Sequence, residues 1–299
     1  MFFNSIFASL PATTPQPTPG FWVHDLSPFI VEFPEGFFLD GIRWYGFAYL
    51  AGFLVGMWLL SFYYKRERSP LNPEAQTNFL LALIVGVIVG GRLGYMLFYA
   101  PEKLWNDPLS LFRVWQGGMA SHGGMLGVLL ATWWTARRYR CGFLRLCDIV
   151  VTLAPAGLLF GRIANFINGE LWGKETDVAW AVVFKFKTLI FGGIEHTSYL
   201  LPRHPSQLYE AATEGLLLLI WTQIRFWKKK PLPPGQLVGE AAILYAASRI
   251  FCEIFREPDA GVSFICGMAR GQFFSVLLAL LGVIFIVFSR IRKDKTVSE

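Results

Sequence analysis

The chain has 299 residues, of which 54% are hydrophobic and only 16% are charged, and its formal net charge is +6. Soluble domains typically carry roughly 25% charged residues, so this composition argues against a soluble globular protein. The positive charge does not indicate a nucleic-acid partner, because the basic residues form short clusters at the ends of apolar blocks, which is a membrane-topology pattern.

The first 43 residues precede the first long apolar block and are expected to form a periplasmic amino-terminal arm. Residues 11–20 (PATTPQPTPG) are a proline-rich loop. The start of the chain lacks the basic region and the small-residue cleavage pattern of a secretory signal, so we expect no cleaved leader. Residues 44–299 are expected to form one membrane domain, because their apolar residues are gathered in uninterrupted blocks.

Seven apolar stretches follow the arm, each close to the roughly 20 residues that a helix needs to cross about 30 Å of hydrocarbon. They run at about 44–64, 77–100, 118–136, 148–168, 207–225, 237–256 and 271–289. The sequence therefore predicts an all-α integral membrane protein with seven transmembrane helices.

Basic clusters recur on alternate connections between these stretches. They are Lys65, Arg66 and Arg68, then Arg137, Arg138 and Arg140, then Lys228, Lys229 and Lys230, and finally Arg290, Arg292, Lys293 and Lys295. The positive-inside rule places all four clusters in the cytoplasm, so an odd number of spans puts the amino terminus in the periplasm and the carboxyl terminus in the cytoplasm. Residues 169–206 then lie outside, and their alternating pattern around 179–186 predicts a small periplasmic head with a short strand.

Ionisable residues inside the apolar stretches each require a partner or a ligand, because one such residue costs at least about 2.5 to 3.5 kcal/mol on insertion scales. They are Arg92, His122, Arg162, Glu214, Glu240, Arg249, Glu253 and, near an edge, Arg256. With a rise of 1.5 Å per residue, Arg92, Arg162 and Arg249 lie about 18 to 22 Å above the cytoplasmic starts of their helices. That depth corresponds to the outer half of the bilayer.

Several of these residues also have a purely structural interpretation. Arg249 and Glu253 stand four residues apart and could form an ion pair within one helix. His122 could be a hydrogen-bonded interface histidine, and Tyr45 could be an aromatic anchor at the membrane surface. Glu214 and Glu240 lie closer to the cytoplasmic side and are expected to be structural.

Counted together, the arginines indicate a ligand. Arg92, Arg162, Arg249 and Arg256 all belong to the outer half, where Glu253 is the evident counter-charge. Such a surplus of positive charge suits an anionic ligand, and arginine recognises phosphate through planar, bidentate contacts. A ligand with an anionic head and an apolar body is most simply a phospholipid.

Motifs along the chain resemble one known family. GRIANFINGELWG at 161–173 is similar to the signature of the prolipoprotein diacylglyceryl transferases. The similarity continues through WYG at 44–46, GGRLGY at 90–95, FRVWQGGMASHGGMLG at 112–127, LPRHPSQLYE at 201–210 and SRIFCEIFREPD at 248–259. One departure is Arg43, which stands where the family often has a histidine before WYG.

The resemblance implies an enzyme that moves the diacylglyceryl group of phosphatidylglycerol to the lipobox cysteine of a prolipoprotein. The products would be a thioether and glycerol phosphate. It also implies a seven-helix fold in the bacterial inner membrane, open sideways to lipid, with the active site toward the periplasm. The alternative from another class is an anion or lipid transporter, because buried arginines also line anion pathways.

The matched motifs imply roles for ten residues. The catalytic ones are His122, Arg162 and Arg249, and the substrate-binding ones are Tyr45, Arg92, Asn165, Glu170, Tyr245, Glu253 and Arg256. Arg162 and Arg249 would hold the phosphate and stabilise charge on the departing oxygen. His122 is the candidate base for the thiol proton. Alternatively, the arginines alone lower the pKa of the thiol and His122 orients the glycerol headgroup.

No cofactor and no metal is expected. Four cysteines, at positions 141, 147, 252 and 266, share no metal-ligand spacing. We interpret them as packing residues, because free cysteine behaves as a small hydrophobe.

Overall fold

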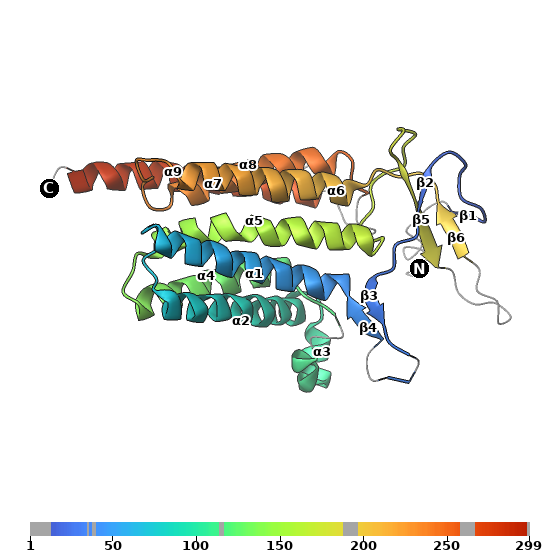
Figure 1. Cartoon of the computed structure of the whole chain (residues 1–299), viewed down its shortest axis with the longest axis horizontal. Coiled ribbons are helices and arrows are strands. Elements are labelled where there is room, and N and C mark those ends of the chain that lie inside the picture. The colour runs from blue at the N-terminus through green and yellow to red at the C-terminus, as the bar shows by residue number, and fades with distance from the viewer. Residues whose placement is uncertain are drawn as a thin grey trace.

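A helical bundle with a small β-rich head at one end makes up the protein (Figure 1). The structure is a computed structural model that describes residues 13–34, 36–37, 40–113, 117–187, 197–257 and 267–297. The strands gather at one end of the bundle, and the carboxyl terminus lies at the other. Successive long helices run in opposite directions between these two ends.

Among the residues that the structure describes, seven long helical segments form the bundle. They are α1 (Trp44–Lys65), α2 (Pro73–Phe98), α4 (Ser121–Arg138), α5 (Phe143–Ile167), the continuous run of α6 (Ser206–Glu210), η3 (Ala211–Leu217) and α7 (Leu218–Phe226), then α8 (Gln236–Glu253) and α9 (Arg270–Val297). Two short helices, α3 (Pro101–Asn106) and η1 (Pro108–Phe112), connect α2 to α4. Each of the seven predicted apolar stretches coincides with one of the long segments.

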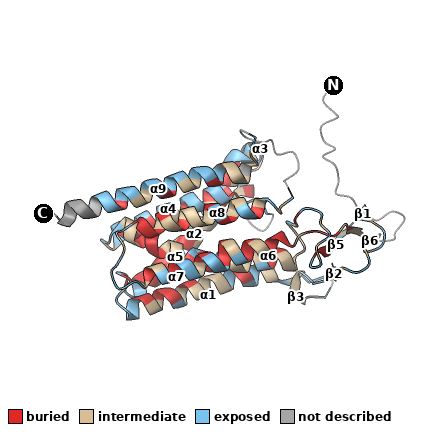
Figure 2. Cartoon of the chain, turned by 90° about the horizontal axis from the view of Figure 1, so that it is seen from above, coloured by how far each residue is buried: buried red, intermediate tan, exposed pale blue. Residues whose placement is uncertain are grey.

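Among the described residues, four helices are long and apolar enough to cross a membrane: α1, α2, α5 and residues Gly271–Ile291 of α9. Helix α8 is less apolar because Glu240, Arg249 and Glu253 all fall within its 18 residues. Figure 2 shows many exposed residues on the outer helix surfaces. They include large apolar side chains such as Leu54 and Ile284, as expected for a chain whose helices face lipid. The chain is therefore a mainly helical membrane protein.

The helix starts are set by local hydrogen bonds. Helix α2 begins after Asn72, whose side chain accepts a hydrogen bond from the Ala75 backbone N at 2.8 Å, and Pro73 occupies its first turn. Helix α8 is capped from another helix, because Asp148 of α5 accepts hydrogen bonds from the backbone N of Gly235 at 2.8 Å and of Val238 at 3.1 Å. These caps fix both helix starts at the end of the bundle away from the head.

The head is a four-stranded sheet in the order β1-β6-β5-β2, built from β1 (Thr13–Thr14), β2 (Trp22–His24), β5 (Val182–Lys187) and β6 (Thr197–Leu200). Strand β2 pairs parallel to β5, and the other pairs are antiparallel. A separate hairpin joins β3 (Phe29–Glu32) to β4 (Gly41–Arg43). Strand β5 coincides with the alternating pattern recognised around 179–186. The bundle itself is helical, in agreement with the all-α expectation, and the arm adds four strands outside it that a local pattern does not predict.

The interior of the bundle differs between its two ends. Close to the basic clusters, the ends of α1 and α7 and the starts of α2, α5 and α8 share an apolar core that includes Leu60, Phe79, Leu146, Ile149 and Leu237. The opposite end, next to the head, contains buried arginine and glutamate side chains, including Arg92, Glu210 and Glu214. The apolar core anchors the helices at one end and leaves the head end for a polar site.

Helices α2 and α4 pack backbone to backbone through glycines. A Cβ atom added at Gly86 would lie 2.5 Å from the carbonyl O of Gly127, and one added at Gly94 would lie 2.9 Å from the Cα of Gly123. Such small residues allow helix axes to approach closely in a membrane, where dispersion contacts drive association.

Gly86→Ala is therefore expected to destabilise the protein by about 1 to 3 kcal/mol, because the added methyl group forces the two backbones apart. The matched control is Gly124→Ala, whose Cβ would meet only the Val87 carbonyl O at 3.8 Å. Thermal unfolding in detergent measures both variants. Equal stability of the two would show that the α2 and α4 contact is looser than the structure indicates.

Candidate functional site

Buried arginines and glutamates from three segments of the chain meet at the head end of the bundle. Arg162 lies in the last third of α5, Glu210 ends α6, Glu214 lies in η3, and Arg249 lies in the second half of α8. The chain runs toward the head along α5 and α8 and away from it along α6 and η3 (Figure 1). This arrangement brings the four side chains to one level of the bundle.

Glu210 and Glu214 each bind both Arg162 and Arg249. Arg162 Nη1 lies 3.1 Å from Glu210 Oε2, and its Nη2 lies 3.1 Å from Glu214 Oε2. Arg249 Nη1 lies 2.5 Å from Glu210 Oε1 and 3.5 Å from Glu214 Oε1. The two arginines predicted to act together are thus held side by side by shared carboxylates.

Two further charged residues, Glu253 at the end of α8 and Arg256 just beyond it, extend this cluster. Arg249 Nη2 lies 3.1 Å from Glu253 Oε2, one turn further on, and Arg256 Nη1 lies 3.2 Å from Glu210 Oε1. Glu210 therefore contacts three guanidinium groups. We call Arg162, Arg249, Arg256, Glu210, Glu214 and Glu253 the arginine–carboxylate cluster.

The predicted surplus of positive charge is wrong for this cluster, which contains three arginines and three glutamates. Glu210 and Glu214 supply the balance, and both side chains are almost fully buried, at 1% and 0% exposure. The interpretation of Glu214 as a residue near the cytoplasmic side is also wrong, because it contacts Arg162 directly. The arginine side chains keep 12 to 17% exposure, so part of each remains accessible.

The backbone of η3 explains why both glutamates reach the arginines. Residues 211–217 form a π-helical stretch, a form that often marks functional sites. A Cβ atom at Gly215 would lie 2.6 Å from the Cα of Leu159 in α5, so only glycine allows this close approach. Helix α5 and the glutamate-bearing segment therefore pack closely enough for direct ion pairs.

A second polar group adjoins the cluster along α5. Asn165 follows Arg162 by three residues and therefore lies on the same face of the helix. Its Nδ2 donates hydrogen bonds to Glu170 Oε1 at 2.8 Å and to the Tyr45 hydroxyl at 3.1 Å. The structure thus brings together the three predicted binding residues Tyr45, Asn165 and Glu170. Gln207 in α6 donates to the Glu170 carbonyl O at 2.6 Å, which fixes the turn after α5.

Tyr245 belongs to the surroundings of the cluster. It lies in α8 one turn before Arg249 and interacts electrostatically with Arg162, Arg249 and Glu214. The structure thus places Tyr245, one of the predicted substrate-binding residues, near both arginines of the cluster.

Arg92 has a different environment from the other predicted arginines. It is 4% exposed, and its guanidinium donates hydrogen bonds to the carbonyl oxygens of Leu111 at 3.3 Å and Gly118 at 3.2 Å, and also to those of Ser110 and Gly117. Within the described ranges it has no carboxylate partner. The structure does not bring Arg92 into the cluster, and instead Arg92 holds the loop between α2 and α4.

His122 also lies outside the cluster. It is exposed in the first turn of α4, and its ring centroid is 5.5 Å from that of Phe274 in α9. It forms no hydrogen bond with another residue in the part of the chain that is described. The first turn of α9 also approaches the cluster, since a Cβ at Gly271 would lie 2.9 Å from Glu253 Oε2. The start of α9 therefore contacts both His122 and the edge of the cluster.

Two buried charged residues at this end of the bundle, Glu210 and Arg203, were not among the predicted site residues. Arg203 is buried and joins three segments, because its Nη1 contacts Glu257 Oε2 at 2.9 Å and its Nη2 contacts Glu175 Oε1 at 3.1 Å. Both residues stand in the LPRHPSQLYE motif, which was the available signal.

The neighbouring His204 has a pKa below its ordinary value because of burial and the charge of Lys174, so its imidazole is neutral at pH 7.

Among the described residues, no group of three His, Cys, Asp or Glu side chains could hold a metal ion. Cys141, Cys147 and Cys252 are free thiols, and the last two are buried. Cys266 lies outside the described residues.

Comparison with known proteins identifies the family of this chain. A model of the prolipoprotein diacylglyceryl transferase family matches residues 35–288. Relatives named phosphatidylglycerol–prolipoprotein diacylglyceryl transferase include one from Pseudoalteromonas atlantica, 41% identical over 85% of this chain and 87% of its own length. Another, from Rhodospirillum rubrum, is 43% identical over 86% of this chain and 91% of its own length. The chain belongs to the prolipoprotein diacylglyceryl transferase family.

Proposed function

We propose that this chain transfers the sn-1,2-diacylglyceryl group of phosphatidylglycerol to the thiol of the lipobox cysteine of prolipoproteins. The transfer forms a thioether and releases glycerol phosphate. The observation that carries the proposal is the pairing of Arg162 with Arg249 through Glu210 and Glu214 at one end of the bundle. The family is a transferase family, and relatives across most of the chain are named for these two substrates.

In this proposal, the chain crosses the bacterial inner membrane seven times, and the reaction takes place at the periplasmic end of the helical bundle. Support comes from the basic residues, because α1, α4, α7 and α9 all reach their basic clusters at the end away from the head. The positive-inside rule makes that end cytoplasmic. Even α4 and α8, with 18 residues each, are about 27 Å long at 1.5 Å per residue, close to the hydrocarbon thickness.

In the proposed mechanism, the cysteine sulfur attacks the glycerol carbon that carries the phosphate. A carbon–sulfur bond forms while the carbon–oxygen bond breaks, and the electron pair of the broken bond stays with the phosphate oxygen. Arg162 and Arg249 stabilise the charge that grows on this oxygen, and stabilisation that strengthens in the transition state raises the rate. Glu210 and Glu214 hold the two guanidinium planes in place while other N–H groups of each arginine bind phosphate.

The remaining predicted residues have supporting roles in this mechanism. Tyr45, Asn165 and Glu170 offer hydroxyl, amide and carboxylate groups that suit the hydroxyl groups of the glycerol head. Tyr245, Glu253 and Arg256 complete the surroundings of the phosphate. Arg92 acts indirectly, through the loop that it holds beside the start of α4.

His122 remains the candidate base, with the alternative that the arginines alone lower the pKa of the thiol. If His122 is the base, His122→Gln is expected to reduce the transfer rate about 10²- to 10⁴-fold at pH 7. The rate should then recover as the pH approaches about 8.5, the pKa of free cysteine, because the thiolate forms without a base. A pH–rate profile measures this recovery.

His204→Gln is the control for this profile, because His204 lies at the same end of the bundle outside the arginine–carboxylate cluster. We expect it to keep the wild-type profile. An unchanged rate in His122→Gln eliminates His122 as the base and leaves the arginine field as the means of activation.

The proposed reaction is tested with the purified chain, phosphatidylglycerol and a lipobox peptide in mixed micelles. We expect glycerol phosphate and diacylglyceryl-modified peptide to appear in equal amounts. A peptide with serine in place of the cysteine is the matched control. It should form both products far more slowly than the cysteine peptide does. Solute flux in proteoliposomes without product formation would instead support the transporter.

A further inference from the structure

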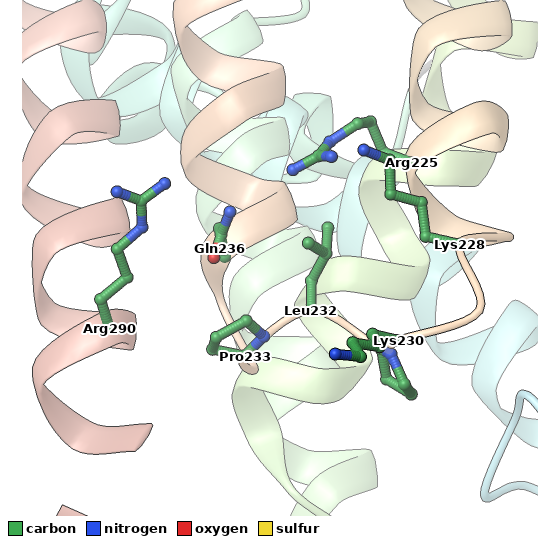
Figure 3. A pocket seen from close by; sticks show the side chains of 8 residues that line it. Arg225, Lys228, Lys230, Leu232, Pro233, Gln236 and Arg290 are labelled. Atoms are coloured by element: carbon green, nitrogen blue, oxygen red, sulfur yellow. The ribbon is translucent and has the colours of Figure 1, made fainter. Parts of the chain in front are cut away.

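An open cavity of about 460 Å³ lies at the end of the bundle away from the arginine–carboxylate cluster (Figure 3). Its wall is formed by the end of α7, the connection to α8, the start of α8 and the last turns of α9. The lining residues are Arg225, Lys228, Lys230, Pro231, Leu232, Pro233, Gln236 and Arg290. Five of the eight lie in the connection between α7 and α8, and Arg290 faces them from α9.

Arg225 contributes little free charge to this cavity. Its Nε donates to Glu240 Oε2 at 2.5 Å, and its Nη2 donates to Glu240 Oε1, so the pair is bidentate. Gln236 Nε2 donates to the same carboxylate at 2.8 Å. Glu240 is thus occupied within the wall and does not face an incoming anion as an unpaired charge.

Three other cations around the cavity are available. Lys228, Lys230 and Arg290 are exposed, and none of them forms an ion pair with a carboxylate whose side chain the structure describes. The nearby carboxylate of Asp148 is occupied by two backbone N–H groups. The cavity therefore gathers positive charge from two segments without matching negative charge in its described wall.

The backbone beneath these cations is held from both sides. Ser289 Oγ in α9 donates to the Pro234 carbonyl O at 2.9 Å. Asp148 in α5 binds the backbone N of Gly235 at 2.8 Å, and Pro231 and Pro233 restrict the loop further. A loop fixed in this way presents its cations at a lower entropic cost of binding than a free loop would.

We propose that this cavity binds the phosphate group of an anionic phospholipid, as a second lipid site separate from the arginine–carboxylate cluster. The inference rests on the proposed membrane orientation, in which this end meets the cytoplasmic leaflet. Basic pockets between helices on that side suit anionic headgroups. A lipid fits better than free phosphate because α9 exposes Ile284, Phe288 and Ile291 around Arg290, which gives acyl chains an apolar surface.

The test measures binding of phosphatidylserine to the full-length protein by native mass spectrometry, with phosphatidylcholine as the neutral lipid. Phosphatidylserine carries the phosphate without the glycerol head of the proposed donor. The pocket variant combines Lys228→Gln, Lys230→Gln and Arg290→Gln, and we expect its affinity for phosphatidylserine to fall on the order of 100-fold. The control combines Lys65→Gln, Lys229→Gln and Arg137→Gln, which removes equal charge from residues that do not line the cavity. It should keep the wild-type affinity.

Equal losses in the two variants would overturn the proposal, because they would reflect general attraction to the basic end. A parallel titration with inorganic phosphate distinguishes the source of the ligand. If the pocket variant loses phosphate binding but keeps lipid binding, the occupant is free phosphate and the lipid assignment is wrong. Both variants should transfer diacylglyceryl groups at the wild-type rate. The transfer assay on the wild type tests the proposed reaction, and the lipid-binding measurement tests this second site, so the two can fail independently.

Discussion

Replacing Arg162 by lysine is expected to lower the transfer rate on the order of 100- to 1000-fold, the usual effect of losing one preorganised donor to a developing negative charge. Lysine keeps the positive charge, but its three donors share one nitrogen, so it lacks the planar fork with which arginine contacts both carboxylates and still offers paired N–H groups to a phosphate. Arg162 makes both contacts at 3.1 Å. The rate is measured as glycerol phosphate released from phosphatidylglycerol in the presence of a lipobox peptide.

Arg225→Lys is the control for this prediction. Arg225 is also a partly buried arginine with a glutamate partner, but it lies at the opposite end of the bundle. We expect this variant to keep most of the wild-type rate. A similar loss in both variants would mean that the effect arises from general destabilisation, and an active Arg162→Lys would remove the basis for the electrostatic mechanism.

Glu210→Gln is expected to destabilise the protein by about 3 to 5 kcal/mol, the range for breaking a buried ion pair by removing one partner. The carboxylate is 1% exposed and contacts Arg162, Arg249 and Arg256. The neutral amide leaves the cluster with excess positive charge in a medium that solvates it poorly. Thermal unfolding in detergent at pH 7 measures the change.

Glu175→Gln is the comparison for this stability measurement. Glu175 contacts a single arginine, Arg203, at 3.1 Å, and it is 48% exposed. Exposed pairs contribute about 0 to 1 kcal/mol, so this variant should unfold close to the wild type. If Glu210→Gln is equally mild, the three arginines do not depend on Glu210 for their charge balance.

The Glu210→Gln variant also distinguishes a role in positioning the arginines from a role in binding the lipid. Because Glu210 is almost fully buried, it acts through the arginines that it holds. We expect folded Glu210→Gln protein to lose rate even at saturating phosphatidylglycerol, since misoriented guanidinium groups stabilise the departing oxygen less well. A change in apparent affinity alone would instead indicate that the arginines stay correctly placed.

The long helices, the basic end of the bundle and the family could all be predicted from local sequence. Apolar stretches of about 20 residues must form helices in lipid, because only helices satisfy every backbone polar group within one segment. This requirement is local, so the seven long helical segments follow from composition along the chain, whereas the short helix α3 does not. The motif at 161–173 is local as well, and it pointed to Arg162, Asn165 and Glu170 as neighbours of one site.

Which charged side chains meet depends on packing between distant segments and could not be predicted from the sequence. Arg162 and Glu210 are separated by the whole head segment, and their contact depends on the π-helical stretch η3 and on the close approach at Gly215. Likewise, the burial of Arg92 under backbone carbonyls and the pairing of β2 with β5 join residues that no periodic pattern relates. An ion pair depends on the distance between two groups in space, and packing between distant segments sets that distance.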